Sequence, residues 1–197
     1  MKIYLKIRNI DHILMNTYSL CGEGCGAIVQ EAFDESSSAD IYGNILGMKV
    51  MSNGKSASIN AKNFLGQERL IPQALKVSKI MTGEVDYIEG HGPGTALADQ
   101  IKMEALAGVF AASMNDSSSM SSRSLLVGSV KSNLGHVHMA ADMAGLIKAI
   151  FKVCKESVPP NAALEKLNPR IKESIASHDF SVELPIVLSS SWTDLVC

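Results

Sequence analysis

Hydrophobic and polar residues follow one another along this chain in blocks that predict alternating strands and helices. Short apolar runs next to glycine or polar residues predict strands at 26–30, 85–91 and 125–130, the first of them buried. A longer apolar run, broken by two glycines, predicts a kinked strand at 41–51. Apolar residues at helical spacing predict helices at 67–80, 98–112 and 136–155.

Two of these helices carry further expectations. Pro72 is compatible with the first helix only if the helix begins near it, because an interior proline costs about 3 kcal/mol. The last helix has an apolar stripe that includes Ala140, Ala144, Ile147, Ile150, Phe151 and Cys154. A serine-rich surface loop is expected at 115–124. The order of strands and helices predicts an α/β layered domain with a mainly covered sheet.

Composition narrows the class of protein without identifying a chemistry. The 197 residues are 46% hydrophobic with a net charge of -2, which favours a globular fold and argues against nucleic acid or an anionic membrane as partner. No apolar run reaches the roughly 18 residues of a membrane span. Residues 1–13 do not resemble a signal peptide. The four cysteines fit free thiols, so we expect a cytoplasmic protein.

Two glycine-rich turns at predicted strand ends carry the candidate chemistry. His91 lies in the turn 89–95, and Lys131 and His136 lie in the turn 131–136. Reacting groups collect at the carboxyl ends of strands in α/β sheets, and glycines leave backbone N–H groups free for an oxyanion. A helix beginning at His136 would keep that imidazole neutral. Two neutral imidazoles that face one carbonyl oxygen would stabilise an enolate.

Other interpretations of these histidines stay open on the residues alone. Histidines in glycine-rich turns are often structural. A zinc site built from His91, His136 and His138 is conceivable, although the spacing is not diagnostic. On a continuous helix His138 lies on another face from His136, so we expect it to be a bystander. His12 and His178 have no surrounding motif and receive no role.

Several ordered blocks resemble the β-ketoacyl synthases, especially the polyketide synthase type. These blocks are 22–29, 85–95, 128–136, 144–149 and 158–161. The resemblance implies a thiolase-like layered α-β-α-β-α fold, of which this chain holds mostly the C-terminal half. It divides the chain into an unmatched segment, the end of the ketosynthase N-terminal half, the C-terminal half and a truncated C-terminal extension, at 1–19, 20–40, 41–171 and 172–197.

The resemblance also implies a reaction, in which an acyltransferase condenses an acyl thioester with a decarboxylating malonyl thioester. His91 and His136 match the two histidines that assist decarboxylation and stabilise the enolate, and Lys131 matches their supporting lysine. The resemblance also implies that substrate is bound by Thr95, Gly92, Gly94 and Asn133. The family holds no metal or tightly bound cofactor, because phosphopantetheine on an acyl carrier protein carries the substrates. It works as a homodimer or as part of a multidomain synthase.

Departures from the family pattern argue against condensing activity in this chain alone. The nucleophile block Ala-Cys-Ser-Ser, expected upstream of Gly22, is absent, and Cys25 matches a non-catalytic position. The family's Gly-Phe-Gly-Gly loop is also absent. Pro93, Lys102 and Asp142 replace a threonine, a carboxylate and a small residue, and Asp142 would be destabilising if buried alone. The alternative is a degenerate, non-catalytic module for dimerisation or partner binding; thiolase-type chemistry is a third possibility.

Overall fold

The computed structural model describes residues 3–8, 22–30, 41–52, 64–92, 94, 96–114, 124–162, 164, 167–178 and 182–183. These described residues form two sheets and five α-helices. One sheet pairs β1 (Ile3–Arg8) and β2 (Glu23–Ile28) antiparallel. The other is parallel, in the order β3 (Tyr87–Glu89), β4 (Leu125–Gly128) and β5 (Val182–Glu183). The helices are α1 (Phe64–Ser78), α2 (Ala96–Met114), α3 (Lys131–Leu134), α4 (Ala141–Lys155) and α5 (Pro169–Ser177), with short 3₁₀ helices η1 (Thr82–Glu84) and η2 (His138–Ala140).

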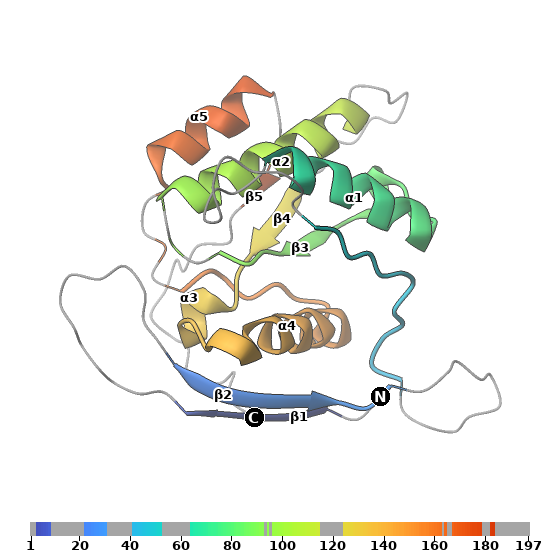
Figure 1. The fold of residues 1–197 in the computed structure, drawn as a ribbon, viewed down its shortest axis with the longest axis vertical. Coiled ribbons are helices and arrows are strands. Elements are labelled where there is room, and N and C mark those ends of the chain that lie inside the picture. Colours follow the sequence, from blue (N-terminus) through green and yellow to red (C-terminus); the bar gives the residue numbers. More distant parts are fainter. Residues whose placement is uncertain are drawn as a thin grey trace.

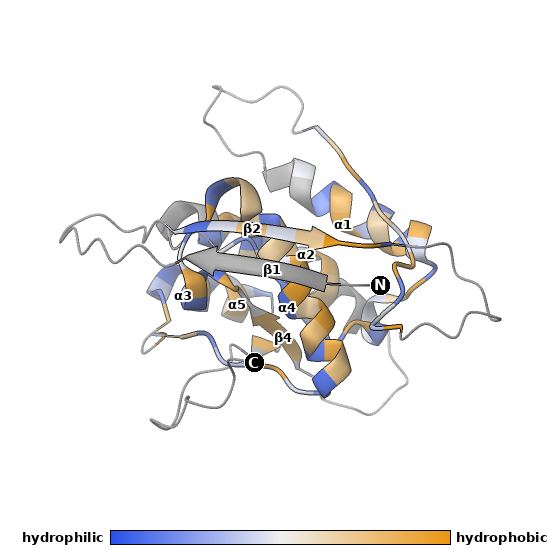
Figure 2. Cartoon of the chain, turned by 90° about the horizontal axis from the view of Figure 1, so that it is seen from below, coloured by the Kyte–Doolittle hydropathy of each residue, from blue (hydrophilic) through white to orange (hydrophobic). Residues whose placement is uncertain are grey.

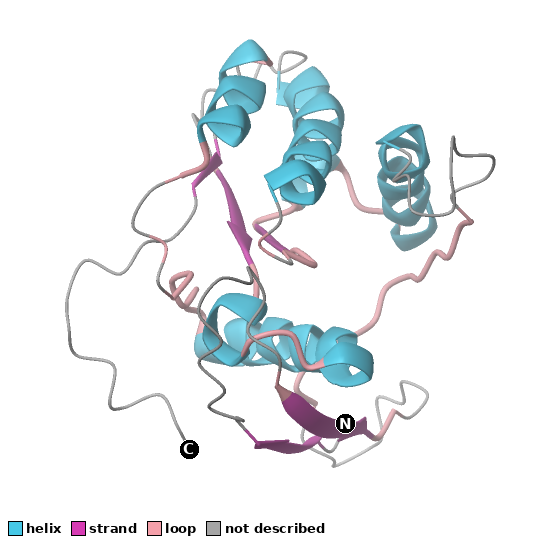
Figure 3. Cartoon of the chain, turned by 60° about the vertical axis from the view of Figure 1, so that its left-hand side comes forward, coloured by secondary structure: helices cyan, strands magenta, loops and turns pink. Residues whose placement is uncertain are grey.

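These elements stack in four layers (Figure 1). Helices α1, α2 and α5 cover one face of the parallel sheet, and α4 covers the other. The β1–β2 ribbon lies on the far side of α4, as Figure 3 also shows from another side. The resulting α-β-α-β order is consistent with the layered α/β fold that the sequence predicts.

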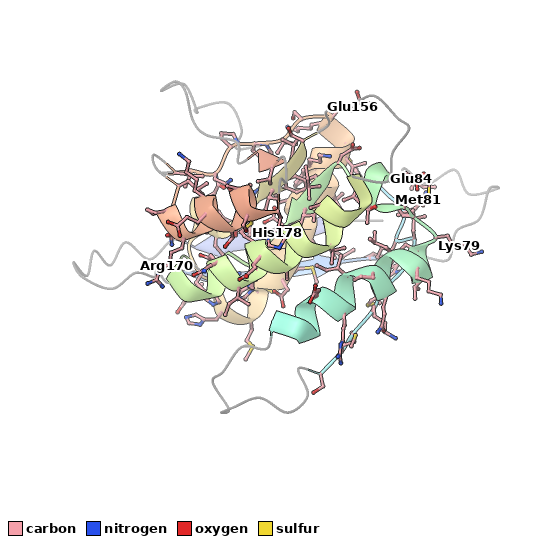
Figure 4. The ribbon with its side chains drawn as sticks, turned by 90° about the horizontal axis from the view of Figure 1, so that it is seen from above. Lys79, Met81, Glu84, Glu156, Arg170 and His178 are labelled. Atoms are coloured by element: carbon pink, nitrogen blue, oxygen red, sulfur yellow. The ribbon has the colours of Figure 1, made fainter. Side chains whose placement is uncertain are left out.

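The larger hydrophobic core lies between the parallel sheet and α2. Its centre is formed by Ala107 and Phe110 of α2, which pack with Leu125 and Val127 of β4. Helix α5 closes this core through Ile171, and α1 lies alongside α2. Figure 4 shows α5 beside α2, with Arg170 and His178 labelled on it.

Helix α4 buries the other face of the sheet, but only over part of the predicted stripe. Ala144, Ile147 and Ile150 are buried, whereas Phe151 and Cys154 are exposed, contrary to expectation. A strand of four residues covers roughly 13 Å, but a helix of 15 residues extends roughly 22 Å. The last turns of α4 therefore extend past the short strands.

The predicted long helix at 136–155 is broken in the structure. Helix α3 ends before Gly135, whose φ is +71°, and η2 contains His138 at φ +45°. These left-handed residues reverse the backbone, so α4 begins only at Ala141. The apolar spacing continues through the turn, which is why the sequence indicated one helix. His136 thus lies in the turn before η2, and the helix-terminus argument for its neutrality does not hold.

Two predicted strands differ from the structure. Residues 41–52 are extended but pair with no described strand, and Leu46, Met48 and Val50 are exposed. Gly47 in this segment lies so close to the end of α1 that an added Cβ would be 2.5 Å from Ser78 Oγ. Strand β2 begins earlier than expected, and its side chains are exposed or half-buried, although β1 pairs with it and η2 and α4 contact it.

Other differences concern element boundaries. Helix α1 begins at Phe64 and holds Pro72 in its interior, where Ile71 and Leu75 packed on the core offset the lost hydrogen bond. Strands β1 and β5 and helix α5 were not predicted. No described helix combines the length and the hydrophobicity that crossing a bilayer requires. The expectations for 115–123, His12, Pro93, Thr95, Cys21 and Cys197 fall outside the described residues.

Candidate active site

The two histidine-bearing turns leave the sheet side by side. Strands β3 and β4 are parallel neighbours, with Glu89 opposite Gly128 in the register. The Gly90 N–H donates to the Gly128 carbonyl at 2.7 Å, which extends the pairing by one step. His91 follows directly, and Lys131 begins α3 three residues after β4. The shared sheet edge therefore brings residues 40 apart in sequence into contact.

Lys131 connects the two turns. Its Nζ donates a hydrogen bond to the His91 carbonyl at 2.6 Å and lies 3.0 Å from His91 Nδ1. The ring of His136 meets the ring of His91 edge-on, with 5.7 Å between centroids. His91, Lys131 and His136, predicted as one constellation, thus lie together.

His138 contacts His136, so the expectation that the two lie on different helix faces is wrong. Its backbone N–H donates to His136 Nδ1 at 3.1 Å, and the two rings stack with centroids 5.0 Å apart. This contact depends on the left-handed backbone of His138 that breaks the predicted helix. On a continuous helix the two side chains would have faced apart.

These contacts select one tautomer for each site histidine. Nδ1 of His136 accepts a backbone N–H, so the neutral ring carries its proton on Nε2. With Lys131 as an ammonium, Nδ1 of His91 is an acceptor as well, and its proton also lies on Nε2. Both imidazoles therefore offer an Nε2–H donor.

The surroundings favour neutral imidazoles. Burial, followed by the charges of Lys102 and Lys131, lowers the pKa of His91 to about 4 despite the opposing charge of Asp142. Burial, Lys131 and His138 also lower the pKa of His136. At neutral pH the two rings are hydrogen-bond donors without charge. The predicted neutrality holds, but burial and nearby cations cause it rather than a helix terminus.

Asn161 and Glu89 are further residues of the site that the sequence analysis did not assign. Buried Asn161 accepts from the Ser129 N–H at 2.9 Å and donates to the Val127 carbonyl at 3.3 Å, which fixes the turn before Lys131. Glu89 accepts from the Val130 N–H in the same turn. Both residues lie in blocks that carry the family resemblance. Because their side chains are enclosed, their polar atoms bond to the backbone around Lys131 rather than to water.

The predicted substrate-binding residues surround the histidines unevenly. Gly92 and Gly94 have φ of +38° and +77°, and a Cβ on Gly92 would lie 2.6 Å from the Ser129 side chain. The Asn133 side chain is exposed and accepts from Ser132 Oγ at 3.1 Å. Among the described residues, no three His, Cys, Asp or Glu side chains are grouped so that they could hold a metal ion.

The profile of the family described as beta-ketoacyl synthase, C-terminal domain, matches residues 42–165. The chain belongs to the β-ketoacyl synthase family. Among its relatives, a phenolphthiocerol/phthiocerol polyketide synthase polypeptide of Mycobacterium tuberculosis is 34% identical over 78% of the chain and 7% of its own length. The highly reducing polyketide synthase srdA of Neurospora crassa is 38% identical over 76% of the chain and 6% of its own length. The chain thus spans less than a tenth of these relatives.

Solved ketosynthases share this fold. The ketosynthase from module 6 of the bacillaene synthase of Bacillus subtilis 168 aligns with a TM-score of 0.70 at 30% identity, over 77% of this chain and 27% of its own. An oxazolomycin ketosynthase domain of Streptomyces albus aligns with a TM-score of 0.72 at 24% identity, over 86% of this chain and 29% of its own. The described elements are therefore a C-terminal portion of the thiolase-like ketosynthase fold.

Two residues that depart from the family pattern act on His91 by their charges. The Asp142 side chain is 95% exposed, so it is not the destabilising buried carboxylate considered from the sequence. Its Oδ1 lies 3.8 Å from His91 Nδ1. Lys102 acts on the same imidazole by its charge. A cation and an anion that the family pattern lacks thus act on one ring.

Proposed function

We propose that this chain supplies the enolate-stabilising side of a β-ketoacyl synthase site in polyketide or fatty-acid assembly. The observation that carries the proposal is the pair of edge-on imidazoles, His91 and His136, each with Nδ1 occupied and Nε2–H available. Neutral donors at a thioester oxygen stabilise negative charge without protonating the nucleophilic carbon.

The chemistry follows from that arrangement. In a malonyl thioester the bond to the carboxylate breaks, carbon dioxide leaves, and the electron pair forms an enolate whose oxygen accepts from His91 and His136. The enolate carbon then attacks an acyl thioester held on a cysteine, a carbon–carbon bond forms, and the thiolate leaves. Lys131 keeps the His91 proton on Nε2, where the reaction needs it.

Delivery of substrate follows the same proposal. An acyl carrier protein brings both thioesters on phosphopantetheine, which Gly92, Gly94, Thr95 and Asn133 would contact. The left-handed glycines let backbone approach such an arm closely. The chain would act within a homodimer or a multidomain synthase and would need no tightly bound cofactor.

The cysteine nucleophile would come from an Ala-Cys-Ser-Ser block, which these 197 residues do not contain. Cys25 is an exposed free thiol on the outer ribbon, and Cys154 is an exposed thiol whose Sγ donates to the Tyr42 carbonyl at 3.3 Å. Incubation with a radiolabelled acyl thioester, followed by denaturing electrophoresis, should leave this chain unlabelled. Stable labelling of Cys25 that a Cys25→Ser variant abolishes would contradict the proposal.

A reconstituted assay tests the enolate role directly. The chain is mixed with a ketosynthase polypeptide that carries the Ala-Cys-Ser-Ser block, and carbon dioxide release and condensed product are measured. We expect His91→Ala and His136→Ala each to lower the rate by about 10²–10³-fold, the typical effect of removing one oxyanion donor. His178→Ala, which alters only the end of α5, is the matched control. Equal rates in all three variants would overturn the role.

One observation favours a second candidate, a non-catalytic module that binds another synthase polypeptide. Leu46, Met48 and Val50 are 62%, 72% and 83% exposed in the extended segment 41–52, whose hydrophobic residues Figure 2 shows. Exposed apolar side chains in a row are typical of contact surfaces. This candidate predicts stable pairing with a synthase polypeptide without catalysis. A chain that stays monomeric and molten in the presence of that polypeptide would argue against it.

A further inference from the structure

The geometry points to Glu89 as a positioning residue, whose buried carboxylate sets the distance between the His91 turn and the Lys131 turn. This inference rests on the proposed function, because it concerns how the same site is held. Glu89 is the last residue of β3, two positions before His91. Its side chain is 11% exposed, so its carboxylate requires partners inside the protein.

The two oxygens of Glu89 bind different parts of the molecule. Oε1 accepts a hydrogen bond from the Val130 N–H, the residue directly before Lys131. Oε2 accepts from the Tyr87 hydroxyl on the same strand and lies 3.1 Å from Lys148 Nζ on α4. One carboxylate thereby links the end of β3, the start of α3 and the middle of α4.

The partners on the Oε2 side are themselves enclosed. Lys148 is 10% exposed, and its ammonium pairs with Glu89 by charge rather than through an aligned hydrogen bond. Burial, together with Glu89, raises the pKa of Tyr87, so the hydroxyl keeps its proton and remains a donor. The carboxylate is thus held in place from α4 and from its own strand, while only Oε1 faces the Lys131 turn.

Neighbouring glycines leave room for this arrangement. A Cβ on Gly128 would lie 2.5 Å from the Tyr87 hydroxyl and 3.3 Å from Lys148 Nζ. A Cβ on Gly145 of α4 would lie 3.3 Å from Glu89 Cγ. The space around the carboxylate is therefore fully used, and the length of the Glu89 side chain sets how far apart the two turns stand.

The consequence reaches the imidazole through Lys131. Val130 N–H fixes the start of α3, and Lys131 is the next residue, with Nζ 3.0 Å from His91 Nδ1. His91 is tied to the other end of the same bridge through β3. Shortening the bridge moves Lys131 relative to His91, and the Nε2–H tautomer of His91 then loses its support.

Glu89→Asp tests the bridge, because aspartate keeps the charge but is one methylene shorter. The readout is the ¹⁵N NMR spectrum of histidines in the full chain. In the unchanged protein we expect His91 Nδ1 to appear as an unprotonated nitrogen. In Glu89→Asp we expect a mixture of His91 tautomers and a titration midpoint that rises from its low value as Lys131 moves away. The His178 signals, at the end of α5, serve as the internal reference.

Two further variants separate positioning from stability. Glu89→Gln combined with Lys148→Met keeps the side-chain length and removes both buried charges, so the His91 tautomer should be retained. Tyr87→Phe removes a partner of Oε2 alone and should lower the thermal midpoint without changing His91. Loss of the tautomer in either variant, or its retention in Glu89→Asp, would overturn the inference. If Glu89→Asp does not fold, the double variant still decides. Because no readout requires turnover, a failed condensation assay alone would count against the proposed function only.

Discussion

The His91 imidazole is partly exposed, yet its pKa lies far below the ordinary value for histidine. Burial and two nearby lysines lower its pKa to about 4, and its side chain is 43% exposed. We expect the His91 resonance in a ¹H NMR titration to stay constant from pH 8 to pH 5.5 and to move with a midpoint near pH 4. A midpoint near 6.5, the ordinary value for histidine, would show that the lysines and burial have no effect.

The same shift makes stability depend on pH. Between about pH 6.5 and pH 4 the unfolded chain binds a proton at His91 and the folded chain does not, so stability falls as the pH is lowered through this window. Urea unfolding at several pH values measures this contribution. His91→Gln should flatten the curve across that window, and a curve of unchanged slope would contradict the assignment.

Asp142 opposes the lysines at the same ring. Its Oδ1 lies 3.8 Å from His91 Nδ1, and its charge raises the pKa of His91, His136 and Lys131. Asp142→Asn should therefore move the His91 midpoint to still lower pH, by less at high salt because the carboxylate is exposed. Glu173→Gln, on the exposed side of α5, is the control and should change nothing. An upward movement in Asp142→Asn would rule out the electrostatic interpretation.

At the residue scale the sequence was sufficient to group the candidate site residues and insufficient to find the residues that hold them in place. His91, Lys131 and His136 were predictable because they lie in turns after two consecutive predicted strands. Glu89 and Asn161 were not assigned, since nothing in the sequence distinguishes a buried carboxylate or amide from a solvated one. The support of His136 by His138 needs a left-handed backbone, which a residue other than glycine rarely adopts.

At the element scale, the close approach of β4 to the half-buried Tyr87 side chain leads to a sharp prediction. Gly128 has no room for a methyl group, because its Cβ would lie 2.5 Å from the Tyr87 hydroxyl. Gly128→Ala should lower the free energy of unfolding by about 1–3 kcal/mol, the usual effect of overpacking. Gly83→Ala in η1, where nothing lies within 4 Å, should change it by less than about 1 kcal/mol. Urea denaturation of both variants measures the difference, and equal effects would contradict the packing described for β4.

Helices and strands were predictable from the sequence where the apolar pattern of their own residues is sufficient to form them. The helix expected at 98–112 exists as α2. Its apolar residues pack against β4 in the core, so its formation does not depend on the elements next to it in sequence. The segment 41–52 has an apolar pattern as strong as that of any strand, but no described strand pairs with it. A strand depends on a partner, and its own residues do not specify one. The same dependence hid β5, a strand of only two residues.

At the scale of the whole molecule, the parallel sheet separates two packed faces. Phe110 of α2 is buried on one face at 2% exposure, and Ile147 of α4 is buried on the other at 1%. The strands between them are three, four and two residues long, so the sheet alone provides few residues that connect the two packed faces. The Glu89 bridge supplies a second link, since it joins β3 to Lys148 of α4 directly.

This coupling predicts a single unfolding transition. Phe110→Ala should lower the free energy of unfolding by about 3–5 kcal/mol, and Ile147→Ala by about 2–5 kcal/mol, because each leaves a cavity in a buried layer. If the sheet and the Glu89 bridge join the two faces, each variant lowers the midpoint for every probe alike, with coincident curves from far-UV circular dichroism and from the backbone amide NMR signals of α2 and α4. If the faces unfold separately, Ile147→Ala will produce an early transition that leaves the α2 side folded. The His91 and Lys131 turns would then separate before the α2 core melts, since Lys131 leads into α4 while His91 leads into α2.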